Sequence, residues 1–283
     1  MMNAGQKRKL QTWFAICLLV VCVTMPLLSH ADQKTYEGSG WDMPEDAVLH
    51  YLDGLREQDI GKMISAYAVE TYIDHFDLKA QLVRVGMHDI YMVPPMPNSG
   101  ILLREINIES RKKQIVESIL WQITSICLPG QDFSRNVALT SENGGEEVSV
   151  FVERIEKAIG ALDFGTLKLM HFTPPEQVNE LYASEGYQER IRAMIAPLGA
   201  DELRGVIAFF IVDENFCVLA CDAIRYGDRW FIHRFNGNIG ALTGLDPIPS
   251  GVLAIPQGEL TNRFEELDSR IQGIFGDLPS NLF

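Results

Sequence analysis

The chain has 283 residues, of which 47% are hydrophobic and 22% are charged, as in ordinary globular proteins. Acidic residues outnumber basic ones by 38 to 24, so the formal net charge is −14. A protein this acidic repels phosphate backbones and anionic lipid surfaces, which excludes nucleic acid as a partner.

The first residues have the order of a secretory signal peptide. Basic residues at 7–9 precede an uncharged run over 13–28, and a small-x-small ending leads up to Ala31. We expect cleavage after Ala31, which leaves a mature domain over 32–283 that is secreted or held in the cell envelope. An uncleaved membrane anchor is the alternative. The run is shorter than the ~20 residues that a membrane span needs, and no second run of that length follows.

Two short helices are expected at the start of the mature domain. Asp42 and Glu45 have the spacing of a capping box, and an apolar stripe from Ala47 to Leu55 follows them. Asp59 is expected to cap a second helix.

The segment from 72 to 160 is predicted to be a helical insertion. Helices are expected over 72–86, with Val83 facing inward, over 109–127 and over 148–159. The three cations at 111–113 are expected to form surface ion pairs. Between the first two helices, the prolines of 92–100 predict an exposed connector, because proline fixes φ and lacks an N–H donor.

The second half of the chain predicts an antiparallel sheet. A strand is expected over 167–172 and a helix over 187–198. Three runs of β-branched and aromatic residues over 206–235 are separated by two short polar breaks, which predicts a three-stranded meander. The tail over about 236–283 ends in a predicted helix over 260–274, whose apolar stripe faces either its own domain or a partner.

These elements predict one α+β domain after the signal peptide. N-terminal helices would pack on a bent antiparallel sheet in a cone-like arrangement, with the helical insertion and a C-terminal helix added to them. After cleavage three cysteines remain, Cys127, Cys217 and Cys221. We expect all three to be buried free thiols, since the last two lie about 13 Å apart on one strand. A bond from Cys127 to either is the alternative.

Motifs for metal and nucleotide chemistry are missing from the sequence. None of the histidines left after cleavage has a metal-ligand partner at a ligating spacing. Three glycines over 237–244 follow a strand, but Phe235 stands where a dinucleotide-binding loop needs its first glycine. We therefore expect no cofactor and no metal.

The last predicted hairpin brings two polar residues together. With a two-residue turn at 227–228, Ile224 faces Phe231 and Asp222 faces His233, and alternation places these residues and Phe235 on one face. A carboxylate beside an imidazole can act as orienting group and base. The alternatives are a surface ion pair and a one-residue slip that separates the two side chains.

The same face predicts a pocket. Its opposite wall would come from the N-terminal helices, through Tyr51, Leu55 and Tyr67. Phe231 is expected to be buried more deeply than Trp230, which lies on the other face of the hairpin.

Two stretches resemble a known family. The pattern P-E-D-A-x-x-x-Y-L-D-G-L-x-x-x-D over 44–59 and the ending Y-G-D-R-W-F over 226–231 are similar to those of the nuclear transport factor 2-like superfamily. The chain also resembles uncharacterised secreted proteins of gut Firmicutes with a K-Y-G-x-x-W-Y ending. The superfamily resemblance covers about half of the mature chain and implies an α+β cone with a cavity between helices and sheet.

Members of that superfamily include isomerases, dehydratases and non-catalytic binding modules. The resemblance therefore implies a cavity more than an activity. We expect an extracytoplasmic, non-catalytic module that binds a small apolar ligand or a partner protein. The alternative is a small-molecule lyase or isomerase that uses Asp222 and His233.

Overall fold

The computed structural model describes residues 35–85, 100–129, 148–178, 180–235 and 250–256. Contacts divide the chain into a first unit over 1–35 and a second over 36–283, and all the described helices and strands belong to the second unit. The predicted signal peptide, the glycines of 237–244 and the predicted helix over 260–274 lie outside the described residues.

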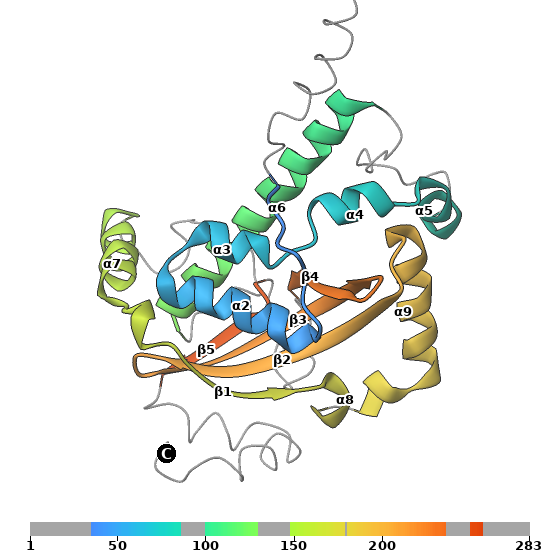
Figure 1. Ribbon diagram of the computed structural model, residues 1–283. Coiled ribbons are helices and arrows are strands. Elements are labelled where there is room, and N and C mark those ends of the chain that lie inside the picture. The colour runs from blue at the N-terminus through green and yellow to red at the C-terminus, as the bar shows by residue number, and fades with distance from the viewer. Residues whose placement is uncertain (1–34, 86–99, 130–147, 179, 236–249, 257–283) are drawn as a thin grey trace, which may run out of the picture. The chain divides into compact units, whose positions relative to one another are not determined.

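The described elements confirm an α+β fold (Figure 1). The helices are α2 (Pro44–Glu57), α3 (Ile60–Ser65), α4 (Glu70–His75), α5 (Leu78–Val85), α6 (Ile101–Cys127), α7 (Val148–Ala161), α8 (Pro175–Val178) and α9 (Glu185–Leu198), with short 3-10 turns η1 (Phe164–Thr166) and η2 (Glu180–Ala183). The strands are β1 (Lys168–Thr173), β2 (Glu202–Val212), β3 (Asn215–Tyr226), β4 (Arg229–Phe235) and β5 (Val252–Pro256).

The sheet is antiparallel and has the order β1-β2-β3-β4. Strand β3 is long enough to pair with two partners along the same edge, since residues 215–219 pair with β5 and residues 221–226 pair with β4. The predicted meander over 206–235 is therefore confirmed. Both hairpin turns use a left-handed backbone, at Asp213 with φ 50° and at Gly227 with φ 62°.

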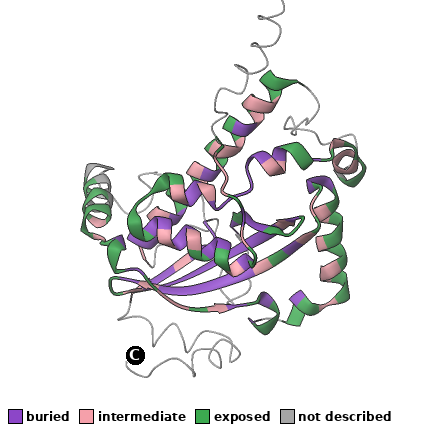
Figure 2. Ribbon diagram, in the orientation of Figure 1, coloured by how far each residue is buried: buried purple, intermediate pink, exposed green. Residues whose placement is uncertain are grey.

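Both faces of the sheet are covered. On β3, alternate residues from Cys217 to Ala223 pack with α2, α3 and α6, while Phe216, Val218 and Ala220 pack on the opposite face with Val178 of α8 and Tyr182 of η2. Figure 2 shows β2, β3 and β4 as largely buried, β1 as mostly intermediate or exposed, and the outer sides of the helices as exposed.

This double covering corrects one expectation. Trp230 and Phe231 point to opposite faces, and each is only 4% exposed. Phe231 is therefore not the more deeply buried of the two, because the face that carries Trp230 is also core.

The start of α2 differs from the prediction, and the start of α3 confirms it. Met43 is the N-cap of α2 and makes no capping hydrogen bond, while Asp42 pairs with Arg229 of β4 at 2.5 Å. Asp59 caps α3 by accepting a hydrogen bond from the backbone N–H of Lys62 at 3.0 Å.

The predicted helix over 72–86 is two helices, α4 and α5. Phe76 has an extended backbone between them, and the next N–H, of Asp77, donates to the carbonyl of Pro197 in α9 at 2.8 Å. The chain therefore leaves the helix in order to pack against the end of α9. Val83, which was expected to face inward, is 79% exposed.

A glycine makes that packing close. Gly199 ends α9 with φ 61°, and a Cβ at this position would lie 1.9 Å from the carbonyl oxygen of His75. No other residue type fits this contact without moving the backbone.

The outer edge of β4 is covered by two earlier segments of the chain. Trp41 exchanges backbone hydrogen bonds with Trp230, at 3.1 and 2.8 Å. Further along, the N–H of Ile232 donates to the carbonyl of Ala66 at 2.9 Å, and its carbonyl accepts from the N–H of Ala68 at 3.1 Å.

The segment before α2 is tied to α4 by two carboxylates. Glu37 accepts hydrogen bonds from the backbone N–H groups of Val69 and Thr71, at 2.8 and 2.9 Å, and from the Thr71 hydroxyl. In return, Glu70 accepts from the backbone N–H groups of Tyr36 and Glu37, at 2.7 and 3.2 Å. Burial raises the pKa of Glu37, against these hydrogen bonds.

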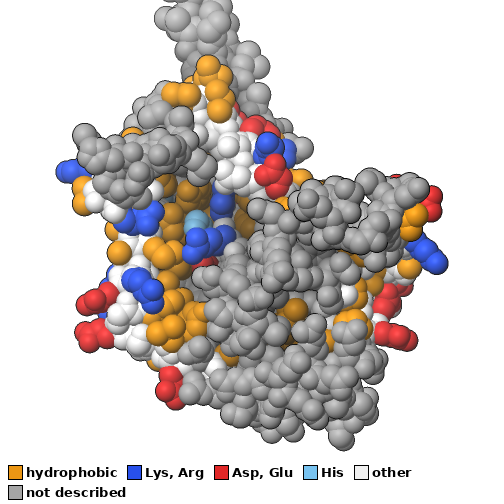
Figure 3. Space-filling model, turned by 180° about the vertical axis from the view of Figure 1, so that it is seen from behind, with side chains coloured by type: hydrophobic (Ala, Val, Ile, Leu, Met, Phe, Trp, Pro, Cys, Tyr) orange, Lys and Arg blue, Asp and Glu red, His pale blue; other side chains and the backbone are white. Residues whose placement is uncertain are grey.

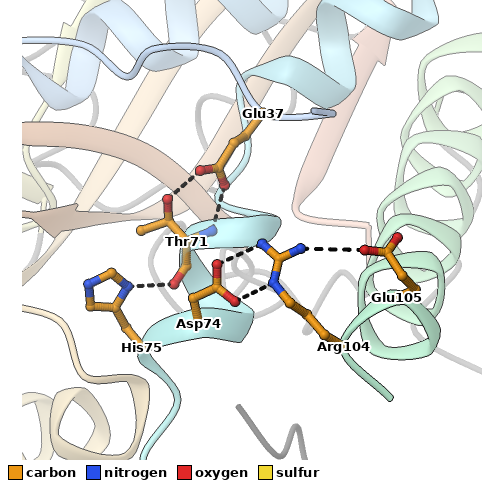
Figure 4. Close-up of polar contacts among 6 residues, drawn as sticks. All are labelled: Glu37, Thr71, Asp74, His75, Arg104 and Glu105. Atoms are coloured by element: carbon orange, nitrogen blue, oxygen red, sulfur yellow. Dashed lines mark hydrogen bonds and ion pairs between the residues drawn. The ribbon is translucent and has the colours of Figure 1, made fainter. Parts of the chain in front are cut away.

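Helix α4 is in turn fixed to α6. Arg104 donates through two nitrogens to both carboxylate oxygens of Asp74, each at 2.7 Å, and also contacts Glu105 (Figure 4). Together these contacts hold the residues that follow α3 against β4 and α6.

The three described cysteines, Cys127, Cys217 and Cys221, are buried and free, as predicted. Among the described helices, none has the length and apolar character needed to cross a membrane.

Candidate functional site

The predicted pairing of β3 with β4 holds from the turn as far as Ala223, which faces Ile232. Between Asp222 and Ala223 a β-bulge shifts the register, and Asp222 then faces Arg234. His233 is the extra residue of the bulge. The prediction that Asp222 faces His233 is therefore wrong, and the reason is a one-residue slip.

Asp222 forms an ion pair with Arg234. Its carboxylate accepts a hydrogen bond from Nε of Arg234 at 2.8 Å, and its side chain is 5% exposed while that of Arg234 is 52% exposed. Burial raises the pKa of Asp222, and the ion pair with Arg234 opposes that rise. The hydrogen bond on which the lyase or isomerase alternative depends is not formed.

His233 is buried, and its Nδ1 has no hydrogen-bond partner among the described residues. Its ring lies against Tyr72 of α4, with 5.6 Å between ring centroids. Burial lowers the pKa of His233 well below 6.5, and the charges of Arg111 and Arg234 lower it further. The ring is therefore neutral at pH 7.

The bulge also divides the predicted pocket. It turns Phe235 to the face of α2 and α3, where its ring lies 5.0 Å from that of Tyr51 and 5.8 Å from that of Tyr67. Ile224 and Phe231 stay on the opposite face. The residues predicted to line one cavity thus belong to two different faces of the sheet.

Part of the predicted wall is nevertheless present. Tyr51, Leu55 and Tyr67 do lie together, in the core between the helices and the sheet, and Phe235 packs against both tyrosines.

Two tyrosine hydroxyls in this core differ in their hydrogen bonding. The hydroxyl of Tyr51 donates to Oε1 of Gln122, whose Nε2 donates to Ser118 at 3.3 Å. The hydroxyl of Tyr67 is buried without a hydrogen-bond partner among the described residues. Burial causes a large rise in the pKa of Tyr67, and the nearby Gln122 opposes that rise slightly.

Arg111 of α6 is the residue that the sequence analysis misplaced. Its Nη2 donates to the backbone carbonyl of His233 and its Nε to that of Ala68 at 3.5 Å. The guanidinium lies over the ring of Tyr72, 4.7 Å from the centroid. Arg111 is therefore not a surface ion pair but a link between α6, the bulge and the segment after α3.

The other two cations of the run are paired as predicted, Lys112 with Glu109 at 3.6 Å and Lys113 with Glu117 at 3.4 Å. The position of Arg111 was nevertheless visible in the sequence. It falls three residues after Ile108 and four before Ile115, both of which are buried, so it lies on the inward stripe of the helix.

We call four residues the Arg111 cluster: Arg111 of α6, Tyr72 of α4, His233 of β4 and Tyr67 of the segment after α3. Burial raises the pKa of both tyrosines and lowers that of His233, and the charge of Arg111 acts to lower all three. The cluster offers hydrogen-bond donors, a neutral imidazole and an aromatic ring, which are suited to binding. Within the described residues, no group of three or more metal-ligating side chains is found.

Comparison with known proteins assigns no family to the chain. No family model matches it, and no curated protein matches it. A solved structure of a cystatin-like protein from Ruminococcus gnavus is similar, with 16% sequence identity and a TM-score of 0.43. The similarity covers 67% of this chain and 39% of that protein, so the chain spans well under half of its length.

Proposed function

We propose that the mature chain is an extracytoplasmic, non-catalytic module that binds a small, largely apolar molecule between its helices and its sheet. One observation carries the proposal: the hydroxyl of Tyr67 and Nδ1 of His233 are both buried and unpartnered among the described residues, and the backbone of Tyr67 pairs with that of Ile232, which precedes His233. Buried polar groups are nearly always satisfied, so two such groups on paired segments of the chain favour a missing partner.

The surroundings of these groups support a ligand with an apolar body. Aromatic rings dominate both sides, with Tyr51 and Phe235 next to Tyr67, and Tyr72 next to His233. Ligand sites in proteins combine apolar walls with a few polar groups of this kind. We also propose that the fold is of the nuclear transport factor 2-like type, because that resemblance implies a cavity between the same layers of helices and sheet.

Binding of a partner protein is the second candidate function. Helix α6 exposes large apolar side chains near its start and its end, which include Ile101, Leu102, Ile106 and Leu120. Exposed apolar side chains that gather on one helix are typical of contact surfaces.

Export is part of the proposal, and it depends on the signal-peptide pattern of residues 7–31. N-terminal sequencing of the protein from the producing cells should give Asp32 as the first residue. Recovery of chains that keep residues 13–28 would contradict export by this route.

Ligand binding is tested by a thermal-shift screen of the purified protein. Compounds with an apolar body should raise the melting temperature, because a ligand that binds only the folded state stabilises it. Sugars and polyols should have no effect. The Tyr67→Phe variant should lose part of the shift, while Tyr36→Phe, the same change at a half-buried position, should keep it. A screen in which no apolar compound acts would contradict the small-ligand proposal and leave the partner-protein candidate.

A further inference from the structure

Arg111 is a half-buried cation whose only acceptors in the described chain are backbone carbonyls. A guanidinium carries a fork of donors that matches a carboxylate, and the bonds to Ala68 and His233 use only Nε and Nη2. Arg104 on the same helix differs from Arg111, because both carboxylate oxygens of Asp74 accept hydrogen bonds from its guanidinium fork. Arg111 thus keeps donors available that Arg104 does not.

Among the residues that the structure describes, the charges around Arg111 leave one positive charge uncompensated. Arg234 is neutralised by Asp222, and His233 is neutral at pH 7. Burial and, to a smaller extent, Arg234 lower the pKa of Arg111, but an arginine stays charged in proteins. A single uncompensated charge in a half-buried place favours one monoanion over a dianion such as the HPO4²⁻ form of phosphate.

The surface carries side chains of the kinds that such a ligand needs. Seen from behind, a histidine and basic side chains lie among hydrophobic ones (Figure 3). In the Arg111 cluster, Tyr72 packs against apolar residues on both of its sides, including Phe76 with 5.9 Å between ring centroids. The second polar anchor is Nδ1 of His233, which is buried and has no hydrogen-bond partner in the described part of the chain.

We infer that the ligand is a small organic monocarboxylate, whose carboxylate is held by Arg111 and His233 and whose apolar body packs against Tyr72. This inference rests on the proposed function and names the chemical class of its ligand. A planar carboxylate fits the guanidinium fork by two parallel hydrogen bonds, which gives orientation as well as affinity.

The test is titration of the purified full chain, followed by ligand-observed NMR. The probes are benzoate and hexanoate, their neutral counterparts benzyl alcohol and hexanol, and inorganic phosphate. We expect both acids to bind at least about tenfold more tightly than the alcohols and than phosphate, which is the effect of a single well-formed charged contact. The Arg111→Lys variant should lose about tenfold in affinity for the acids, because lysine keeps the charge but not the fork.

Arg104→Lys is the matched control, since it makes the same change on the same helix at a fork that is already occupied, and it should leave acid binding unchanged. If Arg111→Lys does not fold, as judged by its thermal unfolding, His233→Gln tests the same site through the second anchor and should weaken acid binding. If the acids and the alcohols bind equally well, and neither variant changes this, the inference that the ligand is a carboxylate is overturned while the proposed function stands. Phosphate that binds as tightly as the acids would also overturn it. Binding of none of the probes would refute the inference.

Discussion

The two core tyrosines allow a test in which one chemical change has opposite effects. Replacing either Tyr51 or Tyr67 by phenylalanine removes a single buried hydroxyl and keeps the ring. Tyr51 is fully buried and Tyr67 is 1% exposed, and their ring centroids lie 6.0 Å apart. Differences in burial therefore do not separate the two variants.

The magnitudes follow from the hydrogen bonds. Tyr51→Phe leaves Oε1 of the buried Gln122 without its donor, which should lower the free energy of unfolding by about 1–3 kcal/mol. Tyr67→Phe removes a hydroxyl that has no partner among the described residues, so the desolvation cost disappears and stability should rise by up to about 1–3 kcal/mol.

Urea unfolding of both variants and of the unaltered protein, without added ligand, measures these differences. The m-value should stay the same, because the surface exposed on unfolding hardly changes. If Tyr67→Phe destabilises the protein as much as Tyr51→Phe does, the hydroxyl of Tyr67 has a partner in the free protein, and its proposed role in ligand binding is refuted. A gain in stability with a loss of ligand binding would be the signature of a functional site.

Three further outcomes are expected. Gly227→Ala should lower the free energy of unfolding by about 1–2 kcal/mol, because the backbone is left-handed and the new Cβ would contact nothing. Gly199→Ala should lower it by about 1–3 kcal/mol more, because its Cβ would also clash with the carbonyl of His75. Equal losses in urea unfolding would contradict the close packing at Gly199. Trp230→Ala and Phe231→Ala should each cost about 3–5 kcal/mol, because both faces of the hairpin are core, and a clearly smaller loss for either would contradict this. Burial depresses the pKa of His233 in the folded state, so the stability that its neutral ring provides is full above pH 6.5 and is lost as the pH falls. The melting temperature of the His233→Gln variant should therefore fall less steeply below pH 6.5 than that of the unaltered protein. An unchanged pH profile would show that the ring does not titrate in this way.

Four of the five strands could be predicted from the sequence because their signals are local, whereas β5, which lies in the predicted tail, was missed. Runs of β-branched residues and the two turn sequences determine where the strands begin and end, and the tight turn at Gly227 sets the register of the first pairs of the last hairpin. Burial of the cysteines also followed, since they lie within apolar stretches.

The candidate site could not be predicted in the same way, because it depends on a bulge. Alternation continues unchanged through His233, so the sequence shows no sign that one residue is left unpaired there. A slip of one residue moved Phe235 to the other face and gave Asp222 a different partner. Arg111 was expected at the surface because of its charge, although its position in the sequence falls on the inward stripe of α6.

The helix break after His75 was missed for a similar reason. Residues 72–86 have a continuous helical pattern, and only the contact with α9, which comes much later in the chain, rewards the extended backbone of Phe76. Local preference was overridden by tertiary packing.

The covered edge of β4 has a consequence for how the protein folds. Its outer backbone groups are paired by Trp41 and by the residues around Ala66, which precede the sheet strands in the chain, so the contacts form only after long loops close. Such contacts form late, because loop-closure entropy must be overcome before they add stability. Until then β4 presents an open edge to other chains, and aggregation should therefore compete with refolding at high protein concentration while the finished fold resists it.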